Sequence, residues 1–272
     1  MSGHYYLEAN ARDLVKARRD VVTEEEVHLT VVIPAFEEVA RLEPTLRRVR
    51  AYLDGQTFSS EVLVVVDGGS DGTLSLVRKL ASDWNSLTVL HNESNFGKGL
   101  AVRRGMLVGR GRYLLFSDAD LSTPIEEVEQ LIAALGRGCD IAIGSRALSG
   151  SDVRLRQVWW REMMGRFFNV LVRGVVLPGI RDTQCGFKCF RRDVARRIFS
   201  RQRIARFCFD VEVLWIGRKL GYRVVEVPVV WVNDPSSRVH PIRDSLRMLF
   251  DLVRLRYNDL RGHYRQDEDV QK

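Results

Sequence analysis

The sequence has few cysteines and no long apolar run, and each absence excludes a class of protein. Four cysteines in 272 residues form no Cys-x-x-Cys pair. The N-terminus does not resemble a signal peptide, so we expect these cysteines to be reduced thiols in the cytoplasm. The closest approach to a membrane span, residues 167–180, is interrupted by Arg173 and is shorter than the roughly 20 apolar residues that a span needs. We therefore expect a chain that does not cross a bilayer, although it could lie on one.

The charge balance is basic, with 42 Lys and Arg against 35 Asp and Glu and a formal net charge of +7. Such a balance favours anionic partners, namely nucleic acids, phosphate esters or anionic lipids. The basic residues are spread along the chain and form no recognised nucleic-acid-binding motif, so nucleic acid is the least favoured partner. A hydrophobic content of 45% is sufficient for the core of one large domain.

Short apolar runs alternate with amphipathic segments in the first half of the chain. The predicted strands are residues 29–35, 61–67, 87–91, 112–118 and 140–145, and the predicted helices are residues 39–54, 74–84, 98–109 and 125–136. Continuous β-branched runs between helices are typical of a mostly parallel sheet with helices on both faces. The predicted fold class is therefore α/β and Rossmann-like, with ligands bound beyond the carboxyl ends of the strands.

The second half of the chain is more varied. It contains predicted helices near 155–173 and 208–220, a strand at 223–232 and an amphipathic helix at 242–257. The apolar stripe of this last helix consists of Ile242, Leu246, Leu249, Phe250, Val253 and Tyr257. We predict three parts: a charged leader (1–27), the α/β domain (28–233), and a C-terminal amphipathic helix and tail (234–272).

Two carboxylates, Asp118 and Asp120, follow the apolar run in "LLFSDADLSTP". Side chains two residues apart in an extended segment point the same way, so both carboxylates can converge on one point. They would repel each other there unless a cation lay between them, and a hard divalent ion suits such ligands. Thr123, Pro124 and Glu126 predict a helix start with a capping box. For an isolated pattern this short, ordinary loop acids are the favoured alternative.

Two other polar segments follow predicted strands. Asp67 precedes a glycine-rich turn, where it could accept a hydrogen bond from the imide N–H of uracil or from guanine. The alternative is a plain turn whose Asp71 or Thr73 caps the next helix. The segment "NFGKG" precedes a predicted helix and offers an anion site with Lys98 nearby, without the spacing of a Walker loop. A surface loop is the alternative.

Arginines and aromatic residues are interleaved in residues 153–168. This pattern suits a phosphate held at an apolar surface. A core helix with snorkelling arginines explains it equally well.

The order of these segments resembles the family-two glycosyltransferases with the GT-A fold. The order is "VVIPAFEE", "VVVDGGSDGT", "NFGKG", "FSDADLSTP", "GSRA" and "RDTQCGFK". Within the family, residues 28–258 are most similar to the dolichyl- and polyprenyl-phosphate glucosyltransferases, and "DTQCGFK" and "FDVEVLW" point to that branch. The resemblance implies an inverting transfer of glucose from UDP-glucose to a polyprenyl or dolichyl phosphate, with Mg²⁺ or Mn²⁺ as cofactor.

The resemblance also implies roles for individual residues. The predicted contacts of the nucleotide sugar are Pro34, Ala35, Glu38, Asp67, Lys98, Asp118, Ala119, Gln184 and Arg238. Asp118 and Asp120 match the metal-binding D-x-D pair, and Arg146 and Arg161 match arginines that hold the acceptor phosphate. Asp118, Asp120 and Arg161 are the predicted catalytic residues. Ser122 stands where the mannosyl branch commonly has Gln, which favours glucose as the donor sugar.

The expected chemistry needs no strong general base, because the attacking phosphate oxygen is already ionised near neutral pH. No obvious catalytic histidine is present in the sequence, in agreement with this. The expected partners are the nucleotide sugar, the polyprenyl phosphate and the inner face of the membrane, with a homo-oligomer as a further possibility. The helices at 155–173 and 242–257 could lie among lipid headgroups, pack on the core or be covered by another copy.

Two alternative functions remain open on the sequence. The first is a transferase that passes a UDP-sugar to a small soluble acceptor. The second is a nucleotide-sugar-binding protein without catalysis.

Overall fold

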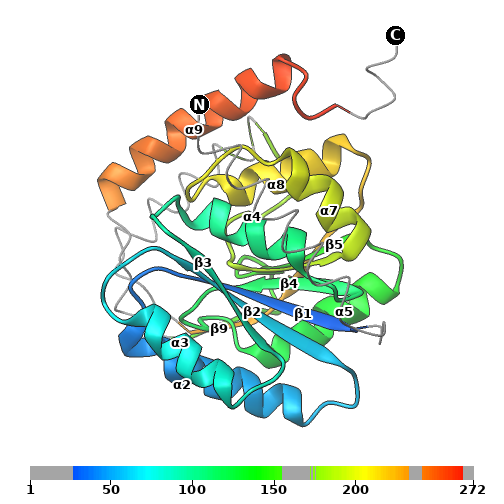
Figure 1. Cartoon of the computed structure of the whole chain (residues 1–272). Coiled ribbons are helices and arrows are strands. Elements are labelled where there is room, and N and C mark those ends of the chain that lie inside the picture. The colour runs from blue at the N-terminus through cyan, green and yellow to red at the C-terminus, as the bar shows by residue number, and fades with distance from the viewer. Residues whose placement is uncertain (1–26, 155–171, 173, 175, 233–240, 266–272) are drawn as a thin grey trace.

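The computed structural model describes residues 27–154, 172, 174, 176–232 and 241–265 (Figure 1). Its strands are β1 (Leu29–Ala35), β2 (Ser60–Asp67), β3 (Leu87–Asn92), β4 (Tyr113–Ser117), β5 (Ile141–Ser145), β6 (Asp152–Arg154), β7 (Phe187–Arg191), β8 (Val224–Pro228) and β9 (Val230–Val232). Its helices are α2 (Val39–Asp54), α3 (Thr73–Ser82), α4 (Lys98–Val108), η1 (Ile125–Glu127), α5 (Val128–Gly136), α7 (Arg192–Arg201), α8 (Phe209–Lys219) and α9 (Pro241–Leu260).

The main sheet has the strand order β3-β2-β1-β4-β7-β5-β8. Strands β1 to β4 are mutually parallel where they pair, and β5 pairs in parallel with β8. Strand β7 lies between β4 and β5 and is antiparallel to both. The short strands β6 and β9 form a second, two-stranded sheet. The prediction of a mostly parallel α/β sheet is confirmed, with one antiparallel strand in its middle.

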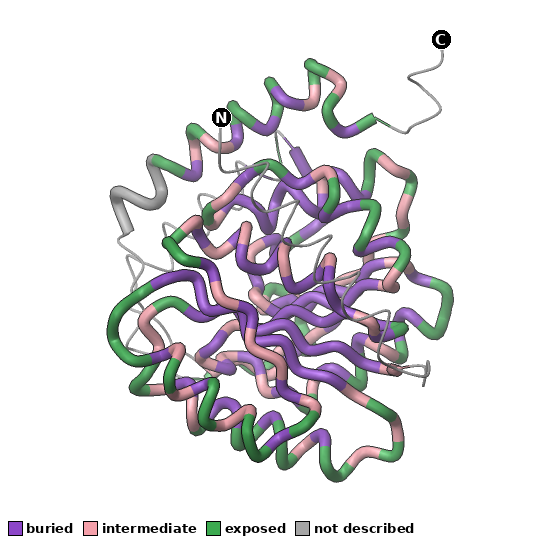
Figure 2. Tube along the Cα trace, viewed as in Figure 1, coloured by how far each residue is buried: buried purple, intermediate pink, exposed green. Residues whose placement is uncertain are grey.

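Helices cover both faces of the main sheet, as Figure 1 shows. Neighbouring residues of a strand point to opposite faces: Val32 joins the apolar cluster beneath α4, α7, α8 and α9, whereas Val31 and Ile33 join the cluster beneath α2, α3 and α5. The strands are buried along nearly their whole length in the middle of the sheet (Figure 2). This two-sided burial explains why they are continuous apolar runs rather than alternating ones.

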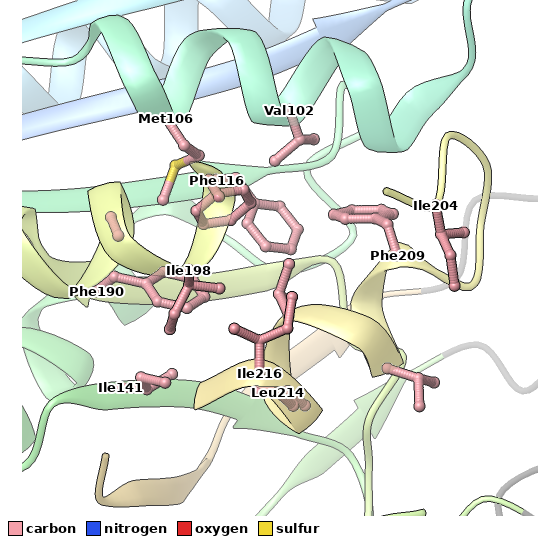
Figure 3. Close-up of a cluster of buried hydrophobic side chains, with 14 of the residues drawn as sticks. Val102, Met106, Phe116, Ile141, Phe190, Ile198, Ile204, Phe209, Leu214 and Ile216 are labelled. Carbon is pink, nitrogen blue, oxygen red and sulfur yellow. The ribbon is translucent and has the colours of Figure 1, made fainter. Parts of the chain in front are cut away.

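Aromatic side chains of the first cluster join strands of the sheet to the helices that cover it (Figure 3). Phe116 of β4 packs against Phe209 of α8, with ring centroids 5.5 Å apart. Phe190 of β7 meets Phe199 of α7 edge to face at 5.4 Å. The strand that carries the carboxylate pair is therefore tied directly to the helix that follows residue 208.

The start of the helix after Asp120 differs from the prediction. Thr123 does not cap it: its Oγ1 lies 3.8 Å from Cys185 Sγ, and Pro124 is extended at ψ 143°. The first turn is the 3₁₀ segment η1, without a side-chain cap. The expected capping box is wrong because Thr123 is buried against the 182–186 segment, which the local sequence pattern does not reveal.

Some of the other predicted helices and strands are present in the structure, and others differ from the prediction. The helices expected at 39–54, 98–109 and 208–220 are present as α2, α4 and α8. Strand β6 and helix α7 were not predicted, and the strand expected at 223–232 is broken into β8 and β9. Most of the leader (1–27) and of the helix expected at 155–173 lies outside the described residues.

The C-terminal helix α9 packs on the same apolar cluster as α8. Met248, Leu252 and Leu255 are buried in that cluster, together with Tyr264 just beyond the helix. In the described segments, no helix combines the length and the apolar character that a membrane crossing requires. All four cysteines fall within these segments, where they are buried and free.

Candidate active site

The carboxylate pair lies at the carboxyl end of β4, in a tight turn. The Asp118 amide donates to the carbonyl oxygen of Gly186 at 3.1 Å, and the Leu121 amide donates to the Asp118 carbonyl at 3.2 Å. Leu121 has a left-handed backbone (φ +46°), and the Asp120 carboxylate accepts a hydrogen bond from the Ser122 amide at 2.9 Å. The turn therefore fixes both acids at the edge of the sheet where ligands of parallel sheets bind.

The two acids interact electrostatically. Burial raises the pKa of Asp120, the Asp118 carboxylate raises it further, and the Ser122 amide and Lys98 oppose the shift. Bringing both acids to the ionised state is thus unfavourable unless a cation joins them. The residues fit a divalent metal in this respect, since their carboxylate oxygens are hard ligands. No group of three or more His, Cys, Asp or Glu in the described residues could hold a metal, so a bound ligand or water would have to complete the coordination.

Gly186, in "DTQCGFK", makes room for Asp118. A Cβ atom at this position would lie 2.1 Å from Asp118 Oδ2 and 2.3 Å from its Cγ. Only glycine allows the carboxylate to sit there, because real Cβ atoms do not approach other atoms so closely. Two motifs that are almost 70 residues apart in the sequence therefore meet at one carboxylate, and the sequence did not assign Gly186 any role.

Lys98 faces the pair from the first residue of α4. Its Nζ lies 2.6 Å from Asp118 Oδ1, and its side chain is 25% exposed. Burial by itself would lower the pKa of Lys98, but the carboxylates of Asp118, Asp210 and Asp120 outweigh it and hold the pKa above its usual value. Gly97 has φ +104° and packs against the carbonyl of Ala205, so the loop before α4 approaches another backbone closely.

A second lysine forms a buried ion pair behind the first. Lys188 of β7 is fully buried, and its ammonium contacts the Asp210 carboxylate of α8 and donates to the Cys185 carbonyl at 2.5 Å. Burial raises the pKa of Asp210, while Lys188 and Lys98 oppose the shift. The pair holds the 182–186 segment, and hence Gly186, against the end of β4.

Arg146, the predicted phosphate contact, is engaged by Asp182. Its Nε and Nη2 donate to the two carboxylate oxygens of Asp182 at 2.7 and 2.8 Å, and its amide donates to Oδ2 at 2.9 Å. The guanidinium also lies over the Trp231 ring, 5.3 Å from the centroid. Burial would raise the pKa of Asp182, but Arg146 lowers it to about 2. The Arg146 side chain remains 28% exposed, so this rigid cation still faces solvent.

Asp67, the predicted base contact, is buried in the loop that precedes α4. Its carboxylate accepts hydrogen bonds from Asn92 Nδ2 at 2.7 Å, the Phe96 amide at 3.2 Å and the Gly97 amide at 2.7 Å. Burial raises the pKa of Asp67, and these three hydrogen bonds oppose the shift. In this structure Asp67 organises the "NFGKG" loop, and its contact with a base remains a prediction.

The end of β1 lies beside these loops. Pro34 and Ala35 are the last residues of the strand, and the Glu38 amide donates to Thr73 Oγ1 at 2.8 Å. The carboxylate of Glu38, which precedes α2, pairs with Arg41 in the first turn of that helix. The Asp71 carboxylate accepts hydrogen bonds from the amide and the hydroxyl of Thr73, the first residue of α3. This agrees with the alternative interpretation of the segment, a turn in which Asp71 caps the next helix.

The remaining predicted residues divide into two groups. Ala119 is buried between the two acids, and its carbonyl accepts from Thr45 Oγ1 at 2.7 Å. The Gln184 amide donates to Asp182, and its side chain reaches Met248 Sδ of α9 at 3.8 Å. Arg161 and Arg238 lie outside the described residues.

Sequence reasoning missed three charged residues as well as Gly186. Asp182, Lys188 and Asp210 were not assigned roles, yet all three are buried beside the predicted site. The sequence did contain a signal for two of them: Lys188 interrupts the apolar run "FKCF", and Asp210 lies in the largely apolar segment "FDVEVLW". A charge in an otherwise buried element must be paired.

Comparison with known proteins gives consistent matches. Residues 30–199 match the family model described as glycosyl transferase family 2. Dolichyl-phosphate β-glucosyltransferase of Dictyostelium discoideum is 36% identical over 248 residues, which cover 87% of this chain and 76% of that protein. The Homo sapiens protein of the same name is 34% identical over 253 residues, covering 88% and 78% of the two chains.

Two solved structures share the fold at low sequence identity. Glucosyl-3-phosphoglycerate synthase from Mycobacterium tuberculosis, in complex with Mn²⁺, UDP and glucosyl-3-phosphoglycerate, matches with a TM-score of 0.63 at 18% identity. The match covers 90% of this chain and 83% of the synthase. A mannosyltransferase from Pyrobaculum calidifontis, in complex with GDP-mannose and Mn²⁺, matches with a TM-score of 0.58 at 19% identity, covering 94% and 74% of the two chains.

Proposed function

Since the chain belongs to glycosyl transferase family 2, we propose that it transfers glucose from UDP-glucose to a polyprenyl phosphate, with inversion at the anomeric carbon. The names of the relatives supply the acceptor class, because dolichyl and polyprenyl phosphates are both phosphates of long isoprenoid lipids. The observation that carries the proposal is the Asp118–Asp120 pair, fixed at the carboxyl edge of the sheet by Gly186 and faced by Lys98.

Asp118 and Asp120 would hold a divalent cation, Mg²⁺ or Mn²⁺, and such a cation neutralises charge on a departing diphosphate when it is bound. The Lys98 ammonium faces the pair, 2.6 Å from Asp118 Oδ1. Once the carboxylates bind the cation, Lys98 is free to pair with a diphosphate oxygen instead, at the N-terminus of α4 where anions are favoured. The uridine would lie over the end of β1, near Pro34, Ala35 and Glu38.

In the reaction, an acceptor phosphate oxygen forms a bond to the anomeric carbon while the bond to the UDP oxygen breaks. The attacking oxygen already carries a negative charge, so no residue has to remove a proton from it. Arg146 would bind the acceptor phosphate, because Asp182 and Trp231 hold its guanidinium in one orientation. Rigid placement of both reactants supplies most of the rate acceleration. Arg161 and Arg238 complete the predicted contacts of the acceptor and the donor.

The lipid acceptor places the enzyme at a membrane. We propose peripheral attachment at the inner, cytoplasmic face, where nucleotide sugars are available. Ser122 next to the carboxylate pair supports glucose rather than mannose as the donor sugar.

The test offers radiolabelled UDP-glucose, GDP-mannose and UDP-N-acetylglucosamine separately, with polyprenyl phosphate and either Mg²⁺ or Mn²⁺. We expect label in the organic phase from UDP-glucose, and its loss after chelation of the metal. Asp120→Asn should lower the rate by at least about 100-fold, because it removes a charged metal ligand. Asp54→Asn, on the exposed end of α2, is the matched control and should leave the rate unchanged.

Two results would overturn the proposal. Label on a small water-soluble acceptor, with none on the lipid, would indicate the soluble-acceptor transferase. Binding of UDP-glucose without turnover of any donor would indicate a nucleotide-sugar-binding protein.

A further inference from the structure

Helix α9 has two apolar faces, and only one of them packs on the protein. Met248, Leu252 and Leu255 form the inner face and are at most 9% exposed. The outer face carries four large apolar side chains: Phe250 is 75% exposed, Val253 69%, Tyr257 53% and Leu260 80%. Their spacing of three, four and three residues places them on one stripe of the helix. We call these four residues the outer stripe.

The contacts beyond and beside α9 fix the direction in which the outer stripe faces. The Tyr264 hydroxyl is fully buried and donates to the Glu212 carboxylate of α8 at 2.5 Å. Asn258 donates to the same hydroxyl at 3.2 Å, and Asp259 pairs with Lys219 of α8. The helix is thus anchored by its inner side, and the large exposed fractions of the outer stripe place it on the side turned to solvent. Figure 2 shows exposed residues alternating with buried and partly buried ones along α9.

The charges around the outer stripe are mainly basic. Arg254 and Arg261 are exposed, and Arg261 lies over the Tyr257 ring at 5.0 Å. Arg256 is also exposed, on the flank where its guanidinium lies over the Trp215 ring of α8 at 5.1 Å. The acids of this part of the helix are turned toward the protein, since Asp259 is paired with Lys219 and Asp251 is partly buried. An apolar stripe flanked by exposed arginines complements an anionic lipid surface.

We propose that the outer stripe of α9 is the surface by which the protein docks on an anionic lipid bilayer. The inference rests on the proposed function, because a lipid acceptor has to be collected from a membrane. The contact between Gln184 and Met248 places α9 beside the segment that carries Gly186, so docking would bring the site to the bilayer surface. A second copy of the chain fits less well, because a symmetric contact between two outer stripes would bring the exposed arginines of both copies into one interface.

The experiment measures binding to vesicles of phosphatidylcholine alone and of phosphatidylcholine mixed with phosphatidylglycerol, at low and high salt. The full chain should float with the anionic vesicles at low salt and less at high salt. The variant Phe250→Ser/Val253→Ser/Leu260→Ser should lower the partition coefficient at least about 10-fold, because three apolar groups are removed from an exposed surface.

Two matched pairs of variants isolate the surface. Val253→Ser should weaken binding, whereas Val153→Ser, at a 40% exposed position on β6, should not. Arg254→Gln/Arg261→Gln should reduce the salt dependence, whereas Arg78→Gln/Lys79→Gln on the exposed side of α3 should not. Binding that all of these variants retain at the full level would overturn the inference.

Activity separates this inference from the proposed function. We expect the triple variant to glucosylate a short, water-soluble polyprenyl phosphate at the normal rate but a vesicle-embedded, long-chain acceptor at least about 10-fold more slowly. Equal rates on the embedded acceptor would overturn the docking surface while leaving the proposed function intact. A change from dimer to monomer in the triple variant, with vesicle binding unaltered, would instead show a contact between copies and would also overturn it.

Discussion

The two sides of the carboxylate pair are held by different chemistry. On the side of β2 and α4, the loops are organised by backbone amides that donate to Asp67, and the facing charge is Lys98, whose side chain is 25% exposed. On the side of β7 and α8, the support is a pair of opposite charges, Lys188 and Asp210, whose side chains are 0% and 6% exposed. One side is open to ligands and the other is sealed.

This difference suggests a division of labour. Lys98 can exchange its partner when a ligand enters, because its ammonium is near solvent and its stem is flexible. Lys188 cannot, because a buried ion pair that loses one partner leaves an uncompensated charge. The buried Lys188–Asp210 pair therefore has a structural role, in which it fixes the position of Asp118 through the 182–186 segment. Lys98, which is near solvent, is the lysine that can interact with the ligand.

Gly186→Ala should produce the largest functional effect. The new Cβ would overlap the Asp118 carboxylate, which must then move away from its metal-binding position. A displacement of about 1 Å at a catalytic group costs about 100-fold in rate, and we expect at least that loss. Mn²⁺ affinity, measured by electron paramagnetic resonance, should fall in parallel, whereas the far-ultraviolet circular dichroism should not change.

The matched control is Gly136→Ala at the end of α5, where a Cβ meets nothing within 4 Å. It should leave both metal affinity and rate unaltered. If Gly186→Ala bound Mn²⁺ as tightly as the natural protein, the packing of Gly186 on Asp118 would not be what positions the metal ligand.

Lys188→Met should produce the largest loss of stability. The substitution leaves Asp210 buried without its cation, and breaking such a pair costs about 3–5 kcal/mol. Urea unfolding followed by circular dichroism measures the loss. The double variant Lys188→Met/Asp210→Leu should recover most of it, because a buried charge no longer remains unpaired.

Lys79→Met, on the exposed side of α3, provides the comparison for a lysine at the surface and should change stability by less than about 0.5 kcal/mol. An equal loss of unfolding free energy in the single and the double variant would contradict this structural role of the Lys188–Asp210 pair. The unpaired charge of Asp210 would then not be the cause of the lost stability.

The open side of the site was largely predictable from the sequence. The strands β1 to β4 are continuous apolar runs, and the acids and glycines that follow them mark the edge where parallel strands end. Local patterns suffice here because each strand is followed by its own loop and helix. The order of strands and loops then places Asp118 and Lys98 near each other.

The sealed side was not predictable in the same way. Strand β7 enters the sheet antiparallel between β4 and β5, and this pairing depends on contacts distant in sequence. Lys188, Asp182 and Asp210 break the rule that charged residues lie at the surface, and each is explained only by its partner. The error at Thr123 has the same origin, since its hydroxyl meets Cys185 rather than its own helix.

The smallest of the three effects concerns the pH dependence of the Arg146–Asp182 pair. The pKa of Asp182 in the folded protein is about 2, below its ordinary value of 3.8. The pair therefore contributes stability that is fully present above about pH 4 and is lost as the pH falls toward 2. Without Arg146, burial would instead raise the pKa of Asp182, and its ionisation would destabilise the fold as the pH rises.

We therefore expect Arg146→Gln to lower the free energy of unfolding by about 2 kcal/mol near pH 7, less than a fully buried pair because the Arg146 side chain is 28% exposed. The difference from the natural protein should shrink as the pH falls from about 4 toward 2, and urea unfolding measures it across that range. Arg47→Gln, which removes an arginine that is 70% exposed and paired with Glu43, should cost less than about 0.5 kcal/mol at every pH in this range. A difference for Arg146→Gln that stays constant as the pH falls would mean that Asp182 is not held ionised by Arg146.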